Sequence, residues 1–403
     1  MHILIVTQYF WPENFRINDV AGWLVEKGHQ VTVLTGVPNY PEGALFDGYG
    51  YFNKQQNYNG VKVLRVPLIP RGNGGKLRLV LNYISFAVLA SVVAPFICKE
   101  KYDLIFVFQM SPITQALPAL LLSKIYNCPL VLWVQDLWPE SLSATGAIKS
   151  KQILAIVAML VKFIYQRCDR ILIQSNSFSS SVQHYGGNKN KIFYLPYSAE
   201  SIFSECVLES NLPPVPSGFS VMFAGNIGVA QDFETIVSAA EMLQEYADVS
   251  FIIIGDGRER KSVEDMVQKK GLDNIHFLGR YPLELMPSFF AKADSMLVTL
   301  KREPIFALTI PAKIQSYLAC GKPIIAALDG EGANVILESG AGFVCSSGAA
   351  DELARLVLKM YRLTKSERED MGAKGRDYYE ANFNRDMLLD RLEGWMRELV
   401  KGK

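Results

Sequence analysis

Residues Pro311 to Ala333 read Pro-Ala-Lys-Ile-Gln-Ser-Tyr-Leu-Ala-Cys-Gly-Lys-Pro-Ile-Ile-Ala-Ala-Leu-Asp-Gly-Glu-Gly-Ala. The first residues of this stretch predict a short helix that ends at Gly321. The run Pro323–Ala327 predicts a buried strand, after which the chain enters a glycine-rich turn at Asp329–Ala333. A helix, a glycine stop, a strand and a glycine-rich turn in this order are typical of a parallel α/β sheet.

This glycine-rich turn is a candidate phosphate site. Parallel sheets present ligands at the carboxyl ends of their strands, where small residues let backbone N–H groups approach a phosphate. We therefore expect Gly330, Glu331 and Gly332 to lie at such an edge, with Lys313 and Ser316 one helix face away.

The same alternation of strand and helix extends through both halves of the chain. Because the predicted strands are short, unbroken apolar runs, they favour parallel sheets covered on both faces and hence two Rossmann-like domains facing one another across a cleft. The expected strands are Ile3–Thr7, Val31–Thr35, Val61–Val66, Leu104–Phe108, Leu130–Val134, Ile171–Gln174, Ser220–Ala224, Val249–Gly255, Ile275–Leu278, Ser295–Leu300, Pro323–Ala327 and Gly342–Cys345.

The domain boundary is expected where this alternation lapses. Periodicity is lost between Ser198 and Gly218, where three prolines cluster. We predict a first domain over residues 1–199, a second over 200–380, and a charged C-terminal helix over 381–403. A chain of 403 residues is too long for one core, which agrees with two domains of ordinary size.

Composition narrows the classes of function. A net charge of +1 gives no reason to expect a nucleic-acid partner. The six cysteines are scattered, so a disulfide framework or zinc site is not expected and a reducing cytoplasm fits best. The N-terminus enters a strand directly, without the basic and apolar regions of a signal peptide.

The stretch Leu79–Cys98 is almost continuously apolar and has basic residues on both flanks. We interpret it as a helix buried against a sheet. The alternative is a monotopic segment that dips into a bilayer with its basic neighbours at the headgroups. A transmembrane span is disfavoured, because the strand-like run Asp103–Phe108 follows at once.

The sequence lacks the residue patterns that several kinds of catalytic site require. The four histidines show no metal-ligand spacing, and the sequence contains neither an Asp-x-Asp pair nor a Gly-x-Ser-x-Gly elbow. Metalloenzyme and hydrolase interpretations therefore lose most of their support.

Glycines follow successive strands of the second domain. Gly225-Asn226-Ile227-Gly228 precedes a predicted helix, Gly255-Asp256-Gly257-Arg258 resembles the start of a dinucleotide motif, and Gly279-Arg280 ends the next strand. Such turns allow close approach of a phosphate, and the helix N-terminus favours an anion. Because three consecutive strand ends share this pattern, we expect the second domain to bind a nucleoside diphosphate.

The first domain carries aromatic and acidic loops instead. Tyr9–Asn14 follows the first strand, and Val37–Gly43 is a second polar and aromatic loop suited to sugar rings. Asp136 follows another strand, where its carboxylate is expected to accept a proton or bind a sugar hydroxyl, unless it merely caps a loop. The residues predicted to bind an acceptor are Glu13, Asn14 and Tyr40.

Together these motifs resemble the retaining glycosyltransferases of family 4, which have the GT-B fold. The resemblance rests on Gly225–Gly228, Gly255–Gly257, Phe277–Gly279 and Leu318–Pro323, and it covers essentially the whole chain. A narrower resemblance connects Gln135-Asp136-Leu137-Trp138-Pro139-Glu140-Ser141, Lys313–Tyr317 and Asp329–Ala333 to bacterial N-acetyl-L-fucosamine transferases of O-antigen or capsule assembly.

The family resemblance implies a division of labour. The C-terminal domain would hold the nucleotide sugar, the N-terminal domain would receive the acceptor, and the last helix would cross back to the first domain, with no metal or other cofactor required. The donor residues expected on this basis are Gly225, Asn226, Ile227, Gly228, Gln231, Arg258, Arg280, Lys313, Ser316, Gly330, Glu331 and Gly332.

Two departures from the family pattern concern charge. Ser316 stands where the family has a glutamate that grips the ribose, and Glu303 is the candidate for the other conserved glutamate, at a longer spacing. The usual pair of basic residues after the first glycine turn is replaced by Asn226 and Gln231, so Lys313 and Arg258 are expected to supply the missing charge. Asp136 and Glu303 are the predicted catalytic residues.

The implied activity is retaining transfer of N-acetyl-L-fucosamine from a UDP-sugar to a polyprenyl-diphosphate-linked saccharide. Such an enzyme would be cytoplasmic and peripheral at the inner face of the bacterial inner membrane. Two alternatives remain, a GT-B sugar-nucleotide epimerase and a non-catalytic UDP-sugar-binding protein.

Overall fold

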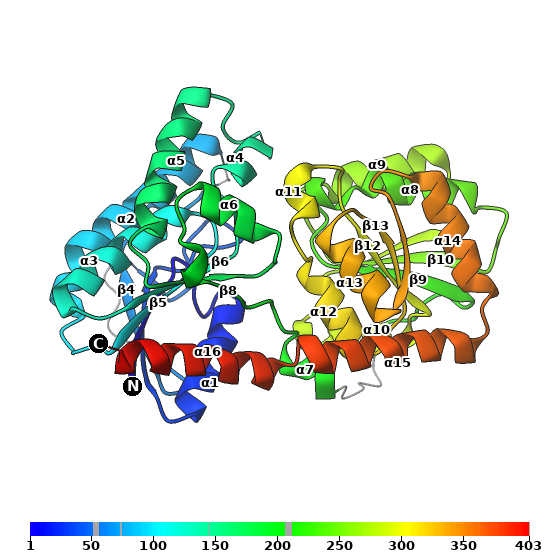
Figure 1. Ribbon diagram of the computed structural model, residues 1–403. Helices are drawn as coiled ribbons and strands as arrows, with labels where there is room; N and C mark the ends of the chain where they lie inside the picture. Colours follow the sequence, from blue (N-terminus) through cyan, green and yellow to red (C-terminus); the bar gives the residue numbers. More distant parts are fainter. Residues whose placement is uncertain (51–55, 73–74, 145, 206–211, 403) are drawn as a thin grey trace. The chain divides into compact units, whose positions relative to one another are not determined.

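The computed structural model describes residues 1–50, 56–72, 75–144, 146–205 and 212–402. Contacts divide the chain into two units, the first formed by Met1–Pro196 with Leu388–Lys403 and the second by Tyr197–Met387. The expected boundary after residue 199 lies three residues beyond this division (Figure 1).

Unit 1 is built on an eight-stranded sheet with the order β3-β4-β2-β1-β5-β6-β7-β8. All neighbouring strands are parallel except β3 and β4, which pair antiparallel. The strands are β1 (His2–Val6), β2 (Gln30–Gly36), β3 (Gln56–Tyr58), β4 (Val61–Val66), β5 (Leu104–Gln109), β6 (Leu130–Val134), β7 (Arg170–Ile173) and β8 (Ile192–Tyr194).

The apolar runs explain why the central strands are parallel. In β1, Ile3, Leu4, Ile5 and Val6 have no exposed surface, because side chains on both faces of the strand are covered. The two strands that the sequence did not predict, β3 and β8, have three residues each and lie at the two edges of the sheet. The strand β3 has the polar sequence Gln-Asn-Tyr, and β8 is an apolar run of only three residues, Ile-Phe-Tyr, so neither is long enough to be recognised as a strand.

Helices connect these strands (Figure 1). They are α1 (Arg16–Glu26), α2 (Lys76–Ile97), the 3₁₀ turn η1 (Ile113–Gln115), α3 (Ala116–Tyr126), α4 (Glu140–Ala144), α5 (Lys151–Tyr165), α6 (Phe178–His184) and the 3₁₀ turn η2 (Lys189–Lys191).

The α2 helix corrects the preferred sequence interpretation of a buried helix. Phe86 and Ala90 on its inner face are buried, but Val88 is 53% exposed, Val92 60% and Phe96 70%. Within the described residues, α2 is the one helix long and apolar enough to cross a membrane, and only 28% of its apolar window is buried. The sequence could not show this, because apolar residues surround the helix on all sides and leave no periodicity that marks the buried face.

Unit 2 contains a six-stranded sheet, entirely parallel, with the order β11-β10-β9-β12-β13-β14. Its strands are β9 (Phe219–Ala224), β10 (Val249–Ile254), β11 (Ile275–Gly279), β12 (Ser295–Thr299), β13 (Ile324–Ala327) and β14 (Gly342–Cys345). Its helices are α7 (Ser201–Glu205), η3 (Val229–Gln231), α8 (Phe233–Met242), α9 (Arg260–Lys270), η4 (Leu283–Leu285), α10 (Met286–Lys292), α11 (Pro304–Ala307), α12 (Ala312–Ala319), α13 (Glu331–Ser339), α14 (Ala350–Arg362) and α15 (Lys365–Asn382).

The last helix, α16 (Arg385–Lys401), packs mainly on unit 1 (Figure 1). The Lys27 Nζ atom lies 2.8 Å from the Asp390 carboxylate, and the His29 Nε2 atom lies 2.8 Å from the Glu393 carboxylate. The C-terminal helix therefore returns to the first domain, as the GT-B fold requires.

Candidate functional site

In unit 2, the turns after β9, β10 and β11 are bonded to one another. The Gly225 N–H donates to the Ile254 carbonyl at 2.9 Å, and the Gly255 N–H donates to the Gly279 carbonyl at 2.8 Å. The Ile227 N–H donates to the Asp256 carbonyl at 2.9 Å. The three glycine turns predicted from the sequence thus form one continuous edge.

Close packing of this edge requires glycine. Gly255 has φ of +139°, and a Cβ atom there would lie 1.8 Å from the Gly225 carbonyl oxygen. Any other residue at this position would push the two turns apart. The Gly-Asp-Gly pattern therefore places two backbone segments in contact at the carboxyl edge of the sheet.

Lys313, in the first turn of α12, is directed at this edge. Its Nζ atom lies 3.7 Å from the centre of the Phe223 ring and 3.4 Å from the position of a Cβ atom built on Gly225. Although the residue is half-buried, the Nζ atom is buried and has no hydrogen-bond partner within the described part of the chain.

Burial lowers the pKa of Lys313 to about 7. Burying an ammonium group without a hydrogen-bond acceptor costs free energy. The position of Lys313 is therefore suited to an anionic ligand. Lys313 thus places a cation beside glycine turns whose backbone a ligand can approach closely.

Other predicted donor residues border the same edge. A Cβ atom on Gly228 would lie 2.5 Å from the Asn226 Nδ2 atom and 3.1 Å from the Gln231 Oε1 atom, so both amides converge there. The Gln231 Oε1 atom is buried and has no partner among the residues described. On another strand end, Gly330 precedes α13, whose first residues are Glu331 and Gly332.

Among the described residues, no hydrogen bond or ion pair joins Lys313 to the remaining predicted donor residues. The Ser316 Oγ atom donates to the Ala312 carbonyl of its own helix at 3.5 Å. Arg258 and Arg280 are exposed, and so is Glu303, which precedes α11. Their roles stay predictions from the sequence.

In unit 1, Asp136 follows β6 and belongs to a short chain of hydrogen bonds. The Ser111 hydroxyl donates to the Asp136 Oδ2 atom at 2.7 Å, and the Trp138 Nε1–H group donates to the Ser111 Oγ atom at 2.9 Å. Burial raises the pKa of Asp136, while hydrogen bonds from Ser111 lower it less strongly. Trp138 and Ser111 thus orient the Asp136 carboxylate.

The Glu13 side chain does not face solvent and instead holds a loop in place through hydrogen bonds. Its side chain is buried and accepts hydrogen bonds from the N–H groups of Asn39 at 2.9 Å, Tyr40 at 2.8 Å and Phe10 at 3.3 Å. Burial raises the pKa of Glu13 to about 7. Glu13 therefore holds the loop that presents Tyr40, and Asn14 is exposed beside it.

Sequence reasoning missed two residues of this region, Arg71 and Tyr83, which accompany Tyr9 of the predicted aromatic loop. The Arg71 guanidinium carbon lies 5.0 Å from the centre of the Tyr40 ring and 5.9 Å from that of Tyr9. The Tyr83 ring lies 6.4 Å from the Trp138 ring. The signal available was Tyr83 itself, a polar aromatic residue inside the apolar run of α2.

A row of glutamines at the carboxyl edge of the unit 1 sheet was also missed. All four are buried, and each has an amide oxygen without a partner in the described structure. These residues are Gln8, Gln109, Gln135 and Gln174. Each ends or closely follows an apolar strand, so its position was visible in the sequence although its burial was not.

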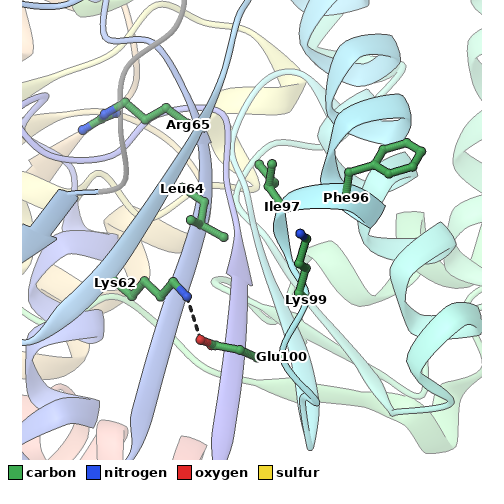
Figure 2. A pocket seen from close by; sticks show the side chains of 7 residues that line it. All are labelled: Lys62, Leu64, Arg65, Phe96, Ile97, Lys99 and Glu100. Carbon is green, nitrogen blue, oxygen red and sulfur yellow. Dashed lines mark hydrogen bonds and ion pairs between the residues drawn. The ribbon is translucent and has the colours of Figure 1, made fainter.

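A pocket of about 440 Å³ lies elsewhere in unit 1, between β4 and the carboxyl end of α2 (Figure 2). Figure 2 shows Lys62 and Glu100 facing each other, with the Nζ atom 2.6 Å from the carboxylate. The Arg65 guanidinium is occupied by the Gln56 side chain and by backbone carbonyls. The charges of Lys62, Glu100 and Arg65 are therefore used within the protein.

No group of three or more histidine, cysteine, aspartate or glutamate side chains gathers as a metal site within the described ranges.

The two halves match different family models. Residues 213–378 match the group 1 glycosyl transferases, and residues 14–198 match the glycosyl transferase 4-like domain.

Two of the similar proteins are bacterial glycosyltransferases. The chain is 24% identical over 336 residues to the putative colanic acid biosynthesis glycosyl transferase WcaI of Escherichia coli K12, covering 80% of this chain and 82% of that protein. It is 27% identical over 282 residues to the probable glycosyltransferase WbjE of Pseudomonas aeruginosa, covering 67% and 68%.

Solved structures show the same fold. Sucrose-phosphate synthase of Thermosynechococcus elongatus matches with a TM-score of 0.74 and 16% identity over 100% of this chain and 99% of that chain. Anabaena Alr3699/HepE in complex with UDP and glucose matches with a TM-score of 0.68 and 18% identity over 99% and 100%. The architecture is therefore GT-B.

Proposed function

Because this chain is a glycosyltransferase with a 4-like domain and a group 1 domain, we propose that it transfers a sugar from a UDP-sugar to a lipid-diphosphate-linked saccharide, with retention of anomeric configuration. Unit 2 would bind the donor and unit 1 the acceptor. The donor nucleotide is proposed from the glycine edge of unit 2 and supported by a structural neighbour solved with UDP.

The observation that carries the proposal is the buried, unpartnered ammonium group of Lys313. During transfer, negative charge develops on the departing diphosphate, and a positioned cation stabilises that charge. The backbone N–H groups of the glycine edge and the start of α13 would add further donors.

The proton of the acceptor hydroxyl needs no strong base in this reaction, because the departing phosphate oxygen can accept it. Asp136 would orient the acceptor hydroxyl or the donor sugar. Glu303 remains the second predicted catalytic residue. We propose that no metal or cofactor takes part, so transfer should persist in excess EDTA.

We propose N-acetyl-L-fucosamine as the sugar and O-antigen or capsule assembly as the setting. The Asp136–Ser141 motif and the Ser316 substitution support an aminodeoxysugar donor. A relative named for colanic acid biosynthesis supports a role in surface polysaccharides.

We also propose that unit 1 binds the cytoplasmic face of the inner membrane through α2, α3 and α5. The exposed apolar side chains of these helices form what we term the apolar face, which comprises Leu77, Val80, Leu81, Ile84, Val88, Val92, Phe96, Leu121, Ile125, Ile153, Ile156, Met159 and Phe163. The α3 helix packs against both α2 and α5, so the three helices are neighbours.

Charge supports a bilayer as the occupant of the apolar face. The helices α2, α3 and α5 contain no aspartate or glutamate, whereas Arg78, Lys124, Lys151 and Lys162 are exposed on them. Apolar side chains bordered by cations match the acyl region and the anionic headgroups of a bacterial membrane.

Calorimetry with UDP tests the donor site. Replacing Lys313 by Ala should weaken UDP binding by about 1–3 kcal/mol, the range for a lost charged hydrogen bond. Lys270→Ala is the matched control, because Lys270 is an exposed lysine of the same unit that pairs with Glu241. Equal UDP affinity in wild type and Lys313→Ala would contradict the proposal.

A further inference from the structure

Arg71 lies in the loop between β4 and α2, and a hydrogen bond from its backbone holds it in place. Its N–H group donates to the Asn39 Oδ1 atom at 3.1 Å, and its guanidinium group lies over the rings of Tyr40 and Tyr9. The guanidinium forms no ion pair in the described part of the chain. Glu13, a nearby acid, directs its carboxylate to backbone N–H groups instead.

The hydroxyl groups around Arg71 are hydrogen-bond donors. Burial raises the pKa of Tyr9 well above its usual value, and burial also raises the pKa of Tyr83. Both phenols therefore stay protonated at neutral pH. A half-buried guanidinium beside protonated phenols is suited to an anion with several oxygens, because the guanidinium fork matches phosphate geometry.

The position of Tyr83 connects this cation to the rest of unit 1. Tyr83 interacts electrostatically with both Arg71 and Asp136, so the three groups belong to one neighbourhood. Ile84, the next residue of α2, is 50% exposed on the apolar face. Because Tyr83 and Ile84 are consecutive on α2, this one helix contributes both to the surroundings of Arg71 and to the apolar face.

We propose that Arg71, with Tyr9, Tyr40 and Tyr83, binds the phosphate groups of the acceptor. The lipid would lie along the apolar face, the phosphates at Arg71, and the sugar hydroxyl near Asp136. This inference rests on the proposed function, since it assigns a subsite to its lipid-diphosphate acceptor.

The test uses the full-length protein saturated with UDP, so that the unit 2 site is filled, and titrates it with geranyl diphosphate in a calorimeter. Wild type should bind, and Arg71→Gln should weaken binding at least tenfold, with Arg71→Lys in between. Arg391→Gln is the matched control, because Arg391 is exposed on α16 in unit 1, outside the apolar face, and its replacement should leave the affinity unchanged. Geraniol, which lacks phosphate, should bind wild type and Arg71→Gln equally.

Unchanged geranyl diphosphate affinity in Arg71→Gln, with UDP still bound, would overturn the inference and leave the proposed function standing. Loss of UDP binding by wild type would instead overturn the proposed function. Binding to phosphatidylglycerol vesicles is measured as a further test. If Arg71→Gln lost vesicle binding but kept geranyl diphosphate affinity, Arg71 would serve lipid headgroups, and the acceptor subsite would be wrong.

Discussion

The ammonium group of Lys313 holds its proton weakly because it is buried without an acceptor. Its pKa of about 7 refers to the protein without a ligand, and a bound diphosphate should raise that pKa. Binding of UDP should therefore be coupled to proton uptake above pH 7.

UDP affinity should consequently fall as the pH rises from 7 to 9, by up to tenfold per pH unit until the pKa of the complex is reached. Calorimetry in buffers of different ionisation enthalpy measures both the affinity and the protons taken up. The Lys313→Ala variant should lose this dependence. A wild-type affinity that stays constant between pH 7 and 9 would contradict the assigned role of the ammonium group.

Ser111 should tune the carboxyl group that it contacts. Its hydrogen bonds lower the pKa of Asp136 against the effect of burial, so Ser111→Ala should raise that pKa further. If the ionised carboxylate is required, the acid limb of the kcat/KM profile should move to higher pH. Asp136→Asn should lower turnover about 100-fold or more at pH values above the acid limb, with UDP affinity unchanged.

Coincident acid limbs in wild type and Ser111→Ala would show that this carboxylate does not control the rate. At the residue scale, the sequence predicted Asp136 because it follows a recognisable strand, and Lys313 because it lies on the helix that precedes a glycine-rich strand end. Ser111 and Arg71 were not predicted, since neither lies in a motif and their importance comes from contacts between loops far apart in sequence.

At the scale of elements, α2 and α5 are both apolar helices that expose several of their large side chains. The sequence predicted a helix at α2 from its apolar content, but the same content describes a core helix and a membrane-facing one. In α5, Ile156 is 60% exposed and Met159 64% exposed, although no motif marks this helix as a surface element. Only the packing of α3 between α2 and α5 reveals one continuous face.

Introducing a charge on this face should release the protein from membranes. In flotation with phosphatidylglycerol-containing vesicles, Ile156→Glu and Val88→Glu should each lower the bound fraction several-fold, because each replaces an inserted apolar side chain by a carboxylate. Leu337→Glu is the matched control, since Leu337 is 59% exposed on α13 of unit 2. Equal flotation of all three variants and wild type would exclude the apolar face as the membrane contact.

For the whole molecule, the packing of α16 on unit 1 contributes to the stability of the folded state. Burial raises the pKa of Glu393, but hydrogen bonds from His29 and Arg397 outweigh that effect and leave it below its ordinary value. A carboxylate with a lowered pKa stabilises the folded state above its unfolded pKa, and this contribution is lost as the pH falls through the folded pKa.

Glu393→Gln should therefore lower the free energy of unfolding by about 1 kcal/mol at pH 7, and the difference from wild type should shrink below pH 4. Chemical denaturation at several pH values measures it. Glu398→Gln is the control on the same helix, because Glu398 is 64% exposed and its ion pair with Arg170 should contribute little. A larger effect from Glu398→Gln would contradict this account of the helix.

Much of the architecture was accessible from the sequence because parallel strands buried on both faces are continuous apolar runs. Two Rossmann-like domains follow from that pattern, whereas the GT-B fold and the returning helix were expected from the family resemblance that the glycine turns carry. The acceptor region was less accessible, since Glu13 looked like a ligand but supports a loop through backbone hydrogen bonds. A buried polar residue that supports a loop and an exposed polar residue that binds a ligand can be of the same type. Only the packing of the folded chain distinguishes them.

The most direct test of the central claim is product analysis with a donor screen. Purified protein is incubated with UDP-sugars, including UDP-N-acetyl-L-fucosamine, and a short isoprenyl-diphosphate-linked saccharide, followed by mass spectrometry and NMR. The account predicts UDP release and an acceptor extended by one sugar, with the donor's anomeric configuration retained. An inverted product, a donor epimer formed without acceptor, or no product from any donor despite measurable UDP binding would contradict it.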